Sequence, residues 1–455
     1  MKKSKTVWLL LLVVSMLFTI AAGCSQGSGD AGGTGDAGGS TDAGQTADGG
    51  NADADAGAKE KVTLEFVRWS NGPELDAEEE DKIKRFNESH PNIEVQMTLL
   101  PWDETFRKIE LSLASNKPVD LFYWDVPAYS WYKKGLFKNL QPYFDRDLKM
   151  DEYHAELFEP FKFDGENMYV APENFQTLTF YYNKTAFDNA GLEYPTSDWT
   201  WDDVLAAAQK LTIREGDQVT QYGFDATAFG TWWAWMSLTA SQGGKLVEDV
   251  HEPKAITLNT PETNNALQLL QDMIFKHKVS PDVATKDSMG LNFQTGKIAM
   301  YAGGDWDLGW LKQITDFEWG MAPLPKWGDG RATPYFMGGY VMANNTEHPD
   351  EAWEFIKWTM TENQATLAKQ HTWIAVHNPS REAAGLPDWA PEGYEAARFE
   401  WMKGGMIGDI YSTRWREAYD KFMVPMQDEI FINGGNVADA LANAEKEINA
   451  ILPME

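Results

Sequence analysis

The sequence is poor in cysteine and in positive charge. Its 455 residues include one Cys, at position 24, which excludes an intramolecular disulfide and any zinc or iron–sulfur site that needs several thiolates. Only 39 Lys and Arg stand against 69 Asp and Glu, so the formal net charge is −30. We therefore expect no nucleic acid partner, because phosphate backbones are bound mainly through Lys and Arg.

Metal-binding patterns are also missing. The seven His residues show neither H-x-x-x-H nor H-E-x-x-H spacing, so a catalytic zinc site is not expected. An acidic stretch at residues 145–152 resembles a calcium loop but lacks the glycine of an EF-hand, and we interpret it as a solvated surface patch. The sequence thus predicts no metal, no cofactor and no enzymatic activity.

The N-terminus has the layout of an export signal. Three lysines precede an apolar run at residues 7–20, which is shorter than the roughly 20 residues that a spanning helix needs. The tetrapeptide A-A-G-C at 21–24 resembles the lipobox of bacterial lipoproteins. We expect residues 1–23 to be removed as a signal peptide and Cys24 to be lipidated, with palmitate among its acyl groups; plain secretion with an incidental Cys is the alternative.

A tether is predicted next. Residues 24–60 are rich in Gly, Ala and Asp and contain no aromatic or large aliphatic side chain, so they cannot offset the entropy of ordering. Coil scaling gives such a segment a span of roughly 30–36 Å. Together with lipid on Cys24, this places the folded part extracellularly, at the outer face of the cytoplasmic membrane.

From Lys61 onward the pattern becomes that of an α/β protein. Residues 62–67 alternate as a strand does, 76–89 have helical spacing, 93–97 alternate again, 103–113 are helical and 119–124 form an apolar run. This β-α-β-α-β order predicts an open α/β sheet whose ligand loops follow the carboxyl ends of its strands.

Five motifs follow one another along the folded part. They are K-R-F-N-E-S-H-P-N-I-E-V (84–95), F-Y-Y-N-K-T-A-F-D-N-A-G-L (180–192), W-T-W-D-D-V-L-A-A-A-Q-K-L-T (199–212), F-Q-T-G-K-I-A-M (293–300) and H-P-D-E-A-W-E-F-I-K-W (348–358). In this order they resemble the signatures of the family 1 extracellular solute-binding proteins, the maltose-binding-protein-like receptors of ABC sugar importers.

The resemblance implies a two-lobed periplasmic-binding-protein-like fold of type II, with a hinge between the lobes and ligand in the interlobe cleft. It also implies the lobe boundaries. The first lobe would comprise 61–172 plus 323–365, and the second lobe would comprise 173–322 plus 366–455.

Tryptophans at predicted strand ends and in predicted loops are the candidates for rings that stack on the ligand. A sugar offers flat C–H faces and hydroxyl edges, so its site needs aromatic rings beside hydrogen-bonding side chains. The family tends to place stacking rings near two of them, Trp124 and Trp306. Core packing is the alternative for each ring. The candidates are Trp69, Trp124, Trp232, Trp233, Trp306 and Trp373.

Polar candidates lie beside these rings. A planar guanidinium at Arg414 suits a pair of sugar hydroxyls or an acidic sugar. Gly338 and Gly339 resemble the family's hinge-proximal glycine segment, where backbone approaches ligand, although an ordinary tight turn explains them nearly as well. A solvated charge or a helix cap is the alternative for the others. The remaining candidates are Asn71, Glu74, Asp125, Glu173, Asn174 and Asp307.

The sequence therefore predicts a monomeric, membrane-tethered receptor that captures a carbohydrate by hinge closure and delivers it to ABC transporter permease subunits, and an oligosaccharide is the expected ligand. The same fold binding a peptide or polyamine is the first alternative. A secreted glycoside hydrolase is the second, but a barrel hydrolase would show eight βα units, whereas the later part of this chain reads as helix-rich.

Overall fold

The computed structural model describes residues 61–115, 119–216, 218–399, 405–408 and 410–452. The predicted signal peptide, Cys24 and tether lie outside these residues. No helix in the described part of the chain combines the length and the apolar character of a membrane span.

The first lobe begins with the β-α-β-α-β unit that the sequence predicts. Strand β1 pairs in parallel with both its neighbours, so the carboxyl ends of three strands meet at one edge of the sheet. Helix α1 begins one turn earlier than the spacing suggested, with a proline in its first turn. The elements are β1 (Val62–Trp69), α1 (Pro73–Ser89), β2 (Ile93–Leu100), α2 (Trp102–Leu113) and β3 (Leu121–Tyr123).

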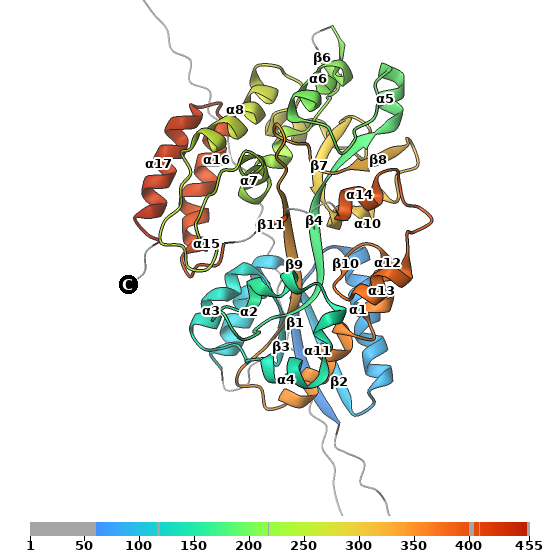
Figure 1. Ribbon diagram of the computed structural model, residues 1–455, viewed down its shortest axis with the longest axis vertical. Coiled ribbons are helices and arrows are strands. Elements are labelled where there is room, and N and C mark those ends of the chain that lie inside the picture. The colour runs from blue at the N-terminus through green and yellow to red at the C-terminus, as the bar shows by residue number, and fades with distance from the viewer. Residues whose placement is uncertain (1–60, 116–118, 217, 400–404, 409, 453–455) are drawn as a thin grey trace, which may run out of the picture. The chain divides into compact units, whose positions relative to one another are not determined.

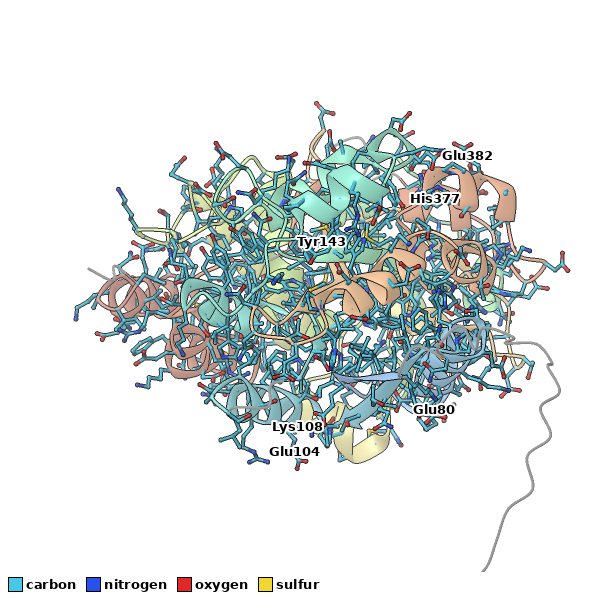
Figure 2. All side chains as sticks on the ribbon, turned by 90° about the horizontal axis from the view of Figure 1, so that it is seen from below. Glu80, Glu104, Lys108, Tyr143, His377 and Glu382 are labelled. Carbon is cyan, nitrogen blue, oxygen red and sulfur yellow. The ribbon has the colours of Figure 1, made fainter. Side chains whose placement is uncertain are left out.

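Short helices and turns complete this lobe and cover its sheet. Charged side chains of α1 and α2, including Glu80, Glu104 and Lys108, point outward (Figure 2). The further elements are η1 (Val126–Ala128), α3 (Tyr129–Lys133), α4 (Gln141–Asp147), η2 (Met150–Glu152), η3 (Ala155–Leu157), η4 (Glu159–Phe161) and α11 (Pro349–Met360).

Two long strands connect the lobes. β4 (Ala171–Asn183) and β9 (Thr333–Met342) run antiparallel and side by side from one lobe into the other (Figure 1). Phe175 packs in the core of the first lobe, whereas Leu178 packs in the core of the second. The chain therefore changes lobes in the middle of a strand.

The second lobe is mostly helical around the far half of β4. A capping box between Thr200 and Asp203 begins α6, and the Thr260 side chain caps α8. Its elements are α5 (Lys184–Ala190), α6 (Trp201–Leu211), β5 (Ile213–Glu215), β6 (Gln218–Gln221), η5 (Ala226–Phe229), α7 (Trp232–Ser241), α8 (Pro261–Phe275), α9 (Val283–Met289), β7 (Met300–Gly304), η6 (Asp305–Asp307), α10 (Leu308–Leu311), β8 (Trp319–Ala322), α15 (Trp415–Ala418), η8 (Tyr419–Met423), α16 (Val424–Phe431) and α17 (Val437–Asn449).

The remaining elements lie where the chain passes between the lobes. They are α12 (Gln364–Gln370), β10 (Ile374–Ala375), α13 (Asn378–Ala384), α14 (Tyr394–Phe399) and β11 (Gly405–Ile407). The main sheet has the strand order β10-β4-β9-β3-β1-β2, while β7 and β8 pair with β4 and β11 pairs with β9.

Packing places two segments differently from the boundaries that the resemblance implied. Residues 323–332 lie with the second lobe, because Leu324 is in its core and Lys326 accepts a hydrogen bond from a backbone N–H of α6. Residues 366–384 lie with the first lobe, because β10 pairs with the first-lobe end of β4 and Val376 is in that core. We propose that the crossings lie within β4, within β9 and between α13 and α14.

Candidate functional site

A cavity of about 540 Å³ lies between the lobes, beside the two connecting strands. This volume is within the usual range for small-molecule sites. Its walls come from the carboxyl ends of β1 and β3, the middle of β4 and β9, and the starts of α2, α7 and η6. The lining residues are Arg68, Trp69, Asn71, Glu79, Trp102, Tyr123, Trp124, Asp125, Asn174, Gln176, Trp233, Trp306, Phe336, Met337, Gly338 and Trp373.

The first lobe supplies the polar wall of this cavity. Asn71 Oδ1 accepts a hydrogen bond from Trp69 Nε1 at 3.1 Å. Asp125 accepts from Trp102 Nε1 at 2.8 Å and from the backbone N–H of Val126 at 2.7 Å. Burial raises the pKa of the Asp125 carboxyl, although these bonds oppose the shift. Amide and carboxylate groups are thereby held in fixed positions before any ligand enters.

A buried charge cluster adjoins that wall, and two of its members, Arg68 and Glu79, line the cavity themselves. Arg68 and Lys82 both contact the Glu79 carboxylate, and Lys82 also contacts Glu173 at 2.9 Å. Burial opposes ionisation of Glu79, but the two cations outweigh it and lower the pKa of Glu79 to about 2. The Arg68 guanidinium stacks 4.5 Å from the centre of the Tyr123 ring. The two cations and two carboxylates balance, so the cluster adds no net charge to the site.

The second lobe supplies an aromatic wall. Trp233 and Trp306 meet edge to face with ring centres 5.8 Å apart, and Phe336 lies 5.7 Å from the first and 5.9 Å from the second. A Cβ at Gly304 would meet the Trp306 ring at 2.3 Å, so the ring can take this position only because residue 304 is a glycine. Rings held in this way can cover the C–H face of a sugar or another flat apolar ligand.

A second cavity, of about 580 Å³, continues the first. The two share Trp102, Asp125 and Trp233. Further along, Trp232 and Trp415 meet edge to face at 5.0 Å and line the second cavity. The two cavities together form an elongated groove with aromatic side chains along its length.

The groove is bridged by contacts between the lobes. Arg416 of the second lobe lies 4.8 Å from the centre of the Trp102 ring and 3.5 Å from the Asp103 carboxylate. Elsewhere, Gln313 of the second lobe donates a hydrogen bond to Glu74 of α1. These exposed contacts are of the kind that can open and close at little cost in free energy.

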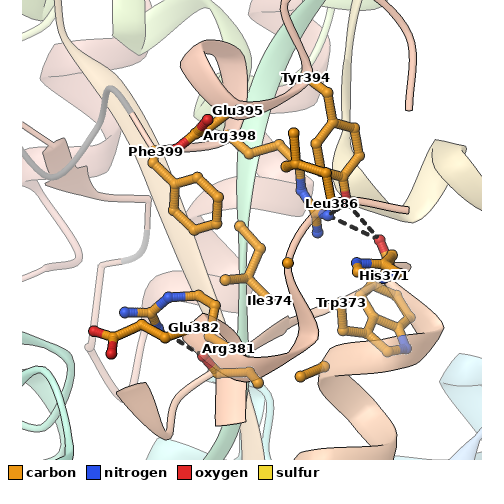
Figure 3. Close-up of a pocket in the computed structure, with 13 residues that line it drawn as sticks. His371, Trp373, Ile374, Arg381, Glu382, Leu386, Tyr394, Glu395, Arg398 and Phe399 are labelled. Atoms are coloured by element: carbon orange, nitrogen blue, oxygen red, sulfur yellow. Dashed lines mark hydrogen bonds between the residues drawn. The ribbon is translucent and has the colours of Figure 1, made fainter. Parts of the chain in front are cut away.

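A smaller hollow of about 340 Å³ lies on the other side of Trp373, between β10, α13 and α14 (Figure 3). Arg398 Nη1 donates to the carbonyl of His371 at 2.8 Å, and Arg381 Nη1 donates to the carbonyl of Ala375 at 2.9 Å. The two guanidinium groups of this hollow thus bind the protein's own backbone. In the described ranges of the chain, no group of His, Cys, Asp and Glu is arranged to hold a metal ion.

Comparison with known proteins identifies the family. Residues 69–366, more than half of the chain, match the family described as bacterial extracellular solute-binding protein. The chain belongs to this family. The family resemblance predicted from the five motifs is confirmed.

Individual relatives have low sequence identity to this chain, but the similarity covers most of its length. A putative binding protein of Brucella abortus is 23% identical over 429 residues, which is 88% of this chain and 95% of the relative. An arabinooligosaccharide-binding protein of Halalkalibacterium halodurans is 26% identical over 299 residues, covering 63% of this chain and 65% of the relative.

Among solved structures, an ABC substrate-binding protein from Listeria monocytogenes in complex with cycloalternan superposes with a TM-score of 0.74 at 24% identity. It covers 87% of this chain and 100% of that chain. This likeness confirms the predicted two-lobed α/β fold.

Nine of the fifteen predicted ligand residues line the main cavity, and Trp232 lines the adjoining one. Trp232 opens helix α7 rather than lying in a turn. Trp124 is 2% exposed and contacts the rings of Phe161, Phe163 and Tyr411, so most of its surface is core. The nine are Trp69, Asn71, Trp124, Asp125, Asn174, Trp233, Trp306, Gly338 and Trp373. Their contact with ligand stays a prediction.

Two predicted ligand carboxylates are directed elsewhere. Glu173 is fully buried and paired with Lys82. Asp307 accepts hydrogen bonds from Trp310 Nε1 at 3.2 Å and from the Tyr301 hydroxyl at 3.3 Å. Burial raises the pKa of Asp307 to about 6. Glu173 pairs with a lysine 91 residues earlier, whereas the partners of Asp307 lie three residues later and six residues earlier. Ligand contact of these two carboxylates stays a prediction.

Three further predicted residues lie outside both cavities. Glu74 bonds Gln313 between the lobes, and Arg414 pairs with Glu417 at 2.6 Å. A Cβ at Gly339 would meet the carbonyl oxygen of Ala171 at 2.4 Å, so this glycine serves the close approach of β9 to β4.

Several lining residues were not found from the sequence. Trp102 could have been found by the search for tryptophans near strand ends, because only Pro101 separates it from the end of β2. Arg68, Tyr123 and Gln176 lie inside strands, where alternation alone does not distinguish a cavity wall from an ordinary sheet face. The other lining residues missed are Glu79, Phe336 and Met337.

Proposed function

We propose that this protein captures a carbohydrate between its lobes and delivers it to the permease of an ABC importer. The observation that supports the sugar most strongly is the composition of the cavity. Rings from both lobes face a wall of amide, carboxylate and guanidinium groups that already have fixed hydrogen bonds. Flat C–H faces and hydroxyl edges match such walls.

Charge argues against a polyamine. A cationic ligand is best bound by ionised carboxylates that lack other partners. Glu79 is neutralised by Arg68 and Lys82, and burial disfavours the ionised form of Asp125. A neutral, hydroxylated ligand fits these groups better, because it needs hydrogen bonds rather than charge.

The same carboxylates argue against glycoside hydrolysis. A hydrolase needs one carboxylic acid that keeps its proton near neutral pH and a second carboxylate across the scissile bond. The two carboxylates of the main cavity both come from the first lobe, and the pKa of Glu79 is about 2. Binding without bond cleavage is therefore our proposal.

Relatives support the same ligand class. Besides the arabinooligosaccharide-binding protein, a multiple sugar-binding protein of Streptococcus mutans is 24% identical over 322 residues. The maltotriose-binding protein of Pyrococcus abyssi is 25% identical over 283 residues. The elongated groove favours a chain of several sugar units over a single ring.

The two-lobed architecture supports a role in transport. The two connecting strands, β4 and β9, act as the hinge. After the ligand enters, the second lobe closes its aromatic wall over the ligand. The closed form then docks on permease subunits in the membrane. We propose that the protein acts as a monomer at the outer face of the cytoplasmic membrane, anchored by lipid on Cys24.

Titration calorimetry against a ligand panel tests this proposal. The panel contains arabinotriose, maltotriose, mannotriose and cycloalternan, with a tripeptide and spermidine as non-sugar probes. We expect at least one sugar to bind with micromolar affinity, which corresponds to about −8 kcal/mol. Binding of the tripeptide or spermidine without any sugar would overturn the ligand class, and release of shortened sugars would overturn the binding role.

A further inference from the structure

A line of hydrogen bonds runs from the buried charge cluster to the cavity wall. Lys82 Nζ donates to both Glu173 oxygens, at 2.9 and 3.1 Å. Asn174 Nδ2 donates to the Tyr123 hydroxyl at 2.9 Å, and Gln176 Nε2 donates to Asn174 Oδ1 at 2.7 Å. The Tyr123 hydroxyl lies 3.5 Å from Glu173 Oε2. Three of the five side chains, Tyr123, Asn174 and Gln176, line the cavity, whereas Lys82 and Glu173 do not.

The negative charge of Glu173 sets the direction of this line. It attracts the O–H dipole of Tyr123, which leaves the lone pairs of that hydroxyl facing Asn174. Asn174 must then present its NH₂ group to Tyr123 and its oxygen to Gln176. Gln176 in turn uses its NH₂ group on Asn174 and offers its own oxygen to a sugar hydroxyl.

The backbone is shaped for this junction. A register shift between Pro172 and Asn174 interrupts the pairing of β4 with β9, and such bulges re-aim side chains. On the facing strand, a Cβ at Gly338 would meet the Tyr123 hydroxyl at 2.2 Å and Asn174 Oδ1 at 3.0 Å. The absence of a side chain at Gly338 therefore leaves room for the hydrogen bond between Asn174 and the Tyr123 hydroxyl.

Stability alone does not explain the Lys82–Glu173 pair. Both side chains are almost fully buried, and burying two ions loses hydration that their attraction often fails to recover. Apolar residues of similar size are frequently as stabilising at such places. The pair can, however, fix the direction of the neighbouring hydrogen bonds, which apolar residues at these positions could not do.

We propose that Lys82 and Glu173 are positioning residues for ligand recognition. They do not touch the ligand; they hold Tyr123 and Asn174 in one orientation, so that Gln176 faces the ligand as an acceptor. This inference rests on the proposed capture of a sugar in the same cavity.

The test is a cycle of variants in the full-length protein, titrated with the sugar of the panel that binds most tightly. K82M/E173M removes both charges and keeps the volume. We expect it to weaken binding about tenfold, because the two amides lose their fixed direction. In the background of Y123F, where the line is already cut, the same pair of changes should weaken binding no more than about twofold.

Two controls keep this test decisive. K184M/E392M removes an ion pair of the second lobe, 3.0 Å long and away from the cavity, and should leave affinity within about twofold. K82Q/E173Q serves if the Met variant does not fold, because its amides preserve size and polarity, and we expect about threefold weaker binding. Circular dichroism confirms that each variant is folded.

Equal losses with and without the Tyr123 hydroxyl would overturn the positioning role and leave a structural one. Unchanged affinity in a folded K82M/E173M or K82Q/E173Q would also overturn it. If the unaltered protein binds no sugar of the panel, the proposed function fails, and this inference fails with it.

Discussion

The two lobes face the same cavity with different chemistry. The first lobe presents Arg68, Asn71 and Asp125 among its rings, each with a hydrogen bond or ion pair inside the protein. Among the residues that the structure describes, the second lobe presents to this cavity the rings of Trp233 and Trp306 and no charged side chain. If the ligand is the proposed sugar, this difference predicts that the first lobe selects which hydroxyl pattern binds, while the second lobe adds apolar cover and affinity.

One carboxylate from each lobe, Glu79 and Asp307, shows a further difference, in the direction of its pKa shift. Glu79 of the first lobe is held ionised by two cations, whereas the described hydrogen-bond partners of Asp307 in the second lobe are the uncharged side chains of Tyr301 and Trp310. The pKa of Glu79 is lowered to about 2 and that of Asp307 is raised to about 6. The stability contributions of these two carboxylates should therefore respond to acid in opposite directions.

The largest expected effect is on the polar wall. Arg68→Met leaves Glu79 with one cation in a buried site, and we expect a loss of about 3–5 kcal/mol in the free energy of unfolding. Urea unfolding measures it. Arg416→Met, which removes an exposed guanidinium, is the control and should lose no more than about 1 kcal/mol. Equal losses for the two variants would contradict the assigned role of the charge cluster.

The aromatic wall should affect affinity rather than preference. Trp306→Ala removes a ring that lies against Trp233 and Phe336, and we expect about 2 kcal/mol weaker sugar binding, with the order of preference among sugars unchanged. Calorimetry with two sugars checks both points. Trp389→Ala, a partly buried ring of the same lobe away from the cavity, is the matched control. A changed order of preference would show that the second lobe also selects.

The response to pH separates the lobes more finely. Because the folded-state pKa of Asp307 is raised from 3.8 to about 6, its favourable contribution is complete below about pH 4 and is lost as the pH rises through 6. Between pH 5 and pH 7.5 the protein should lose about 1–2 kcal/mol of stability relative to Asp307→Asn. Urea unfolding at both pH values measures this difference. The same change in the free energy of unfolding for the unaltered protein and for Asp307→Asn would refute it.

The smallest effect is expected where the lobes touch. Asp103→Asn weakens an exposed 3.5 Å contact with Arg416, so we expect a change of no more than about 0.5 kcal/mol in sugar affinity. The change should disappear at 1 M salt, where the Debye length is about 3 Å. Calorimetry at low and high salt checks this, and a large salt-independent loss would mean that Asp103 binds the ligand directly.

The sequence predicted the parts of the site that follow a local rule. Trp69 is the last residue of β1, and Asn71 and Asp125 lie in the loops that follow β1 and β3. Strand order in an α/β sheet brings such residues together. Residues inside strands, such as Arg68 and Gln176, escaped prediction because both faces of a buried strand look alike in sequence.

Long-range pairing was the other limit. Glu173 pairs with Lys82, 91 residues earlier, and no local pattern reveals this partner. The lobe boundaries are hard to locate from the sequence for a related reason: β4 packs in the cores of both lobes, and a crossing within a strand, as we propose, leaves no turn or composition change to mark it.

A crystal structure of the protein with the sugar that binds most tightly tests the central claim most directly. The division between the lobes predicts one sugar face against Trp306 or Trp233, and hydroxyl groups within hydrogen-bond distance of Asn71, Asp125 or Gln176. Sugar density outside the interlobe cavity, or hydroxyls bound only by the second lobe, would contradict it.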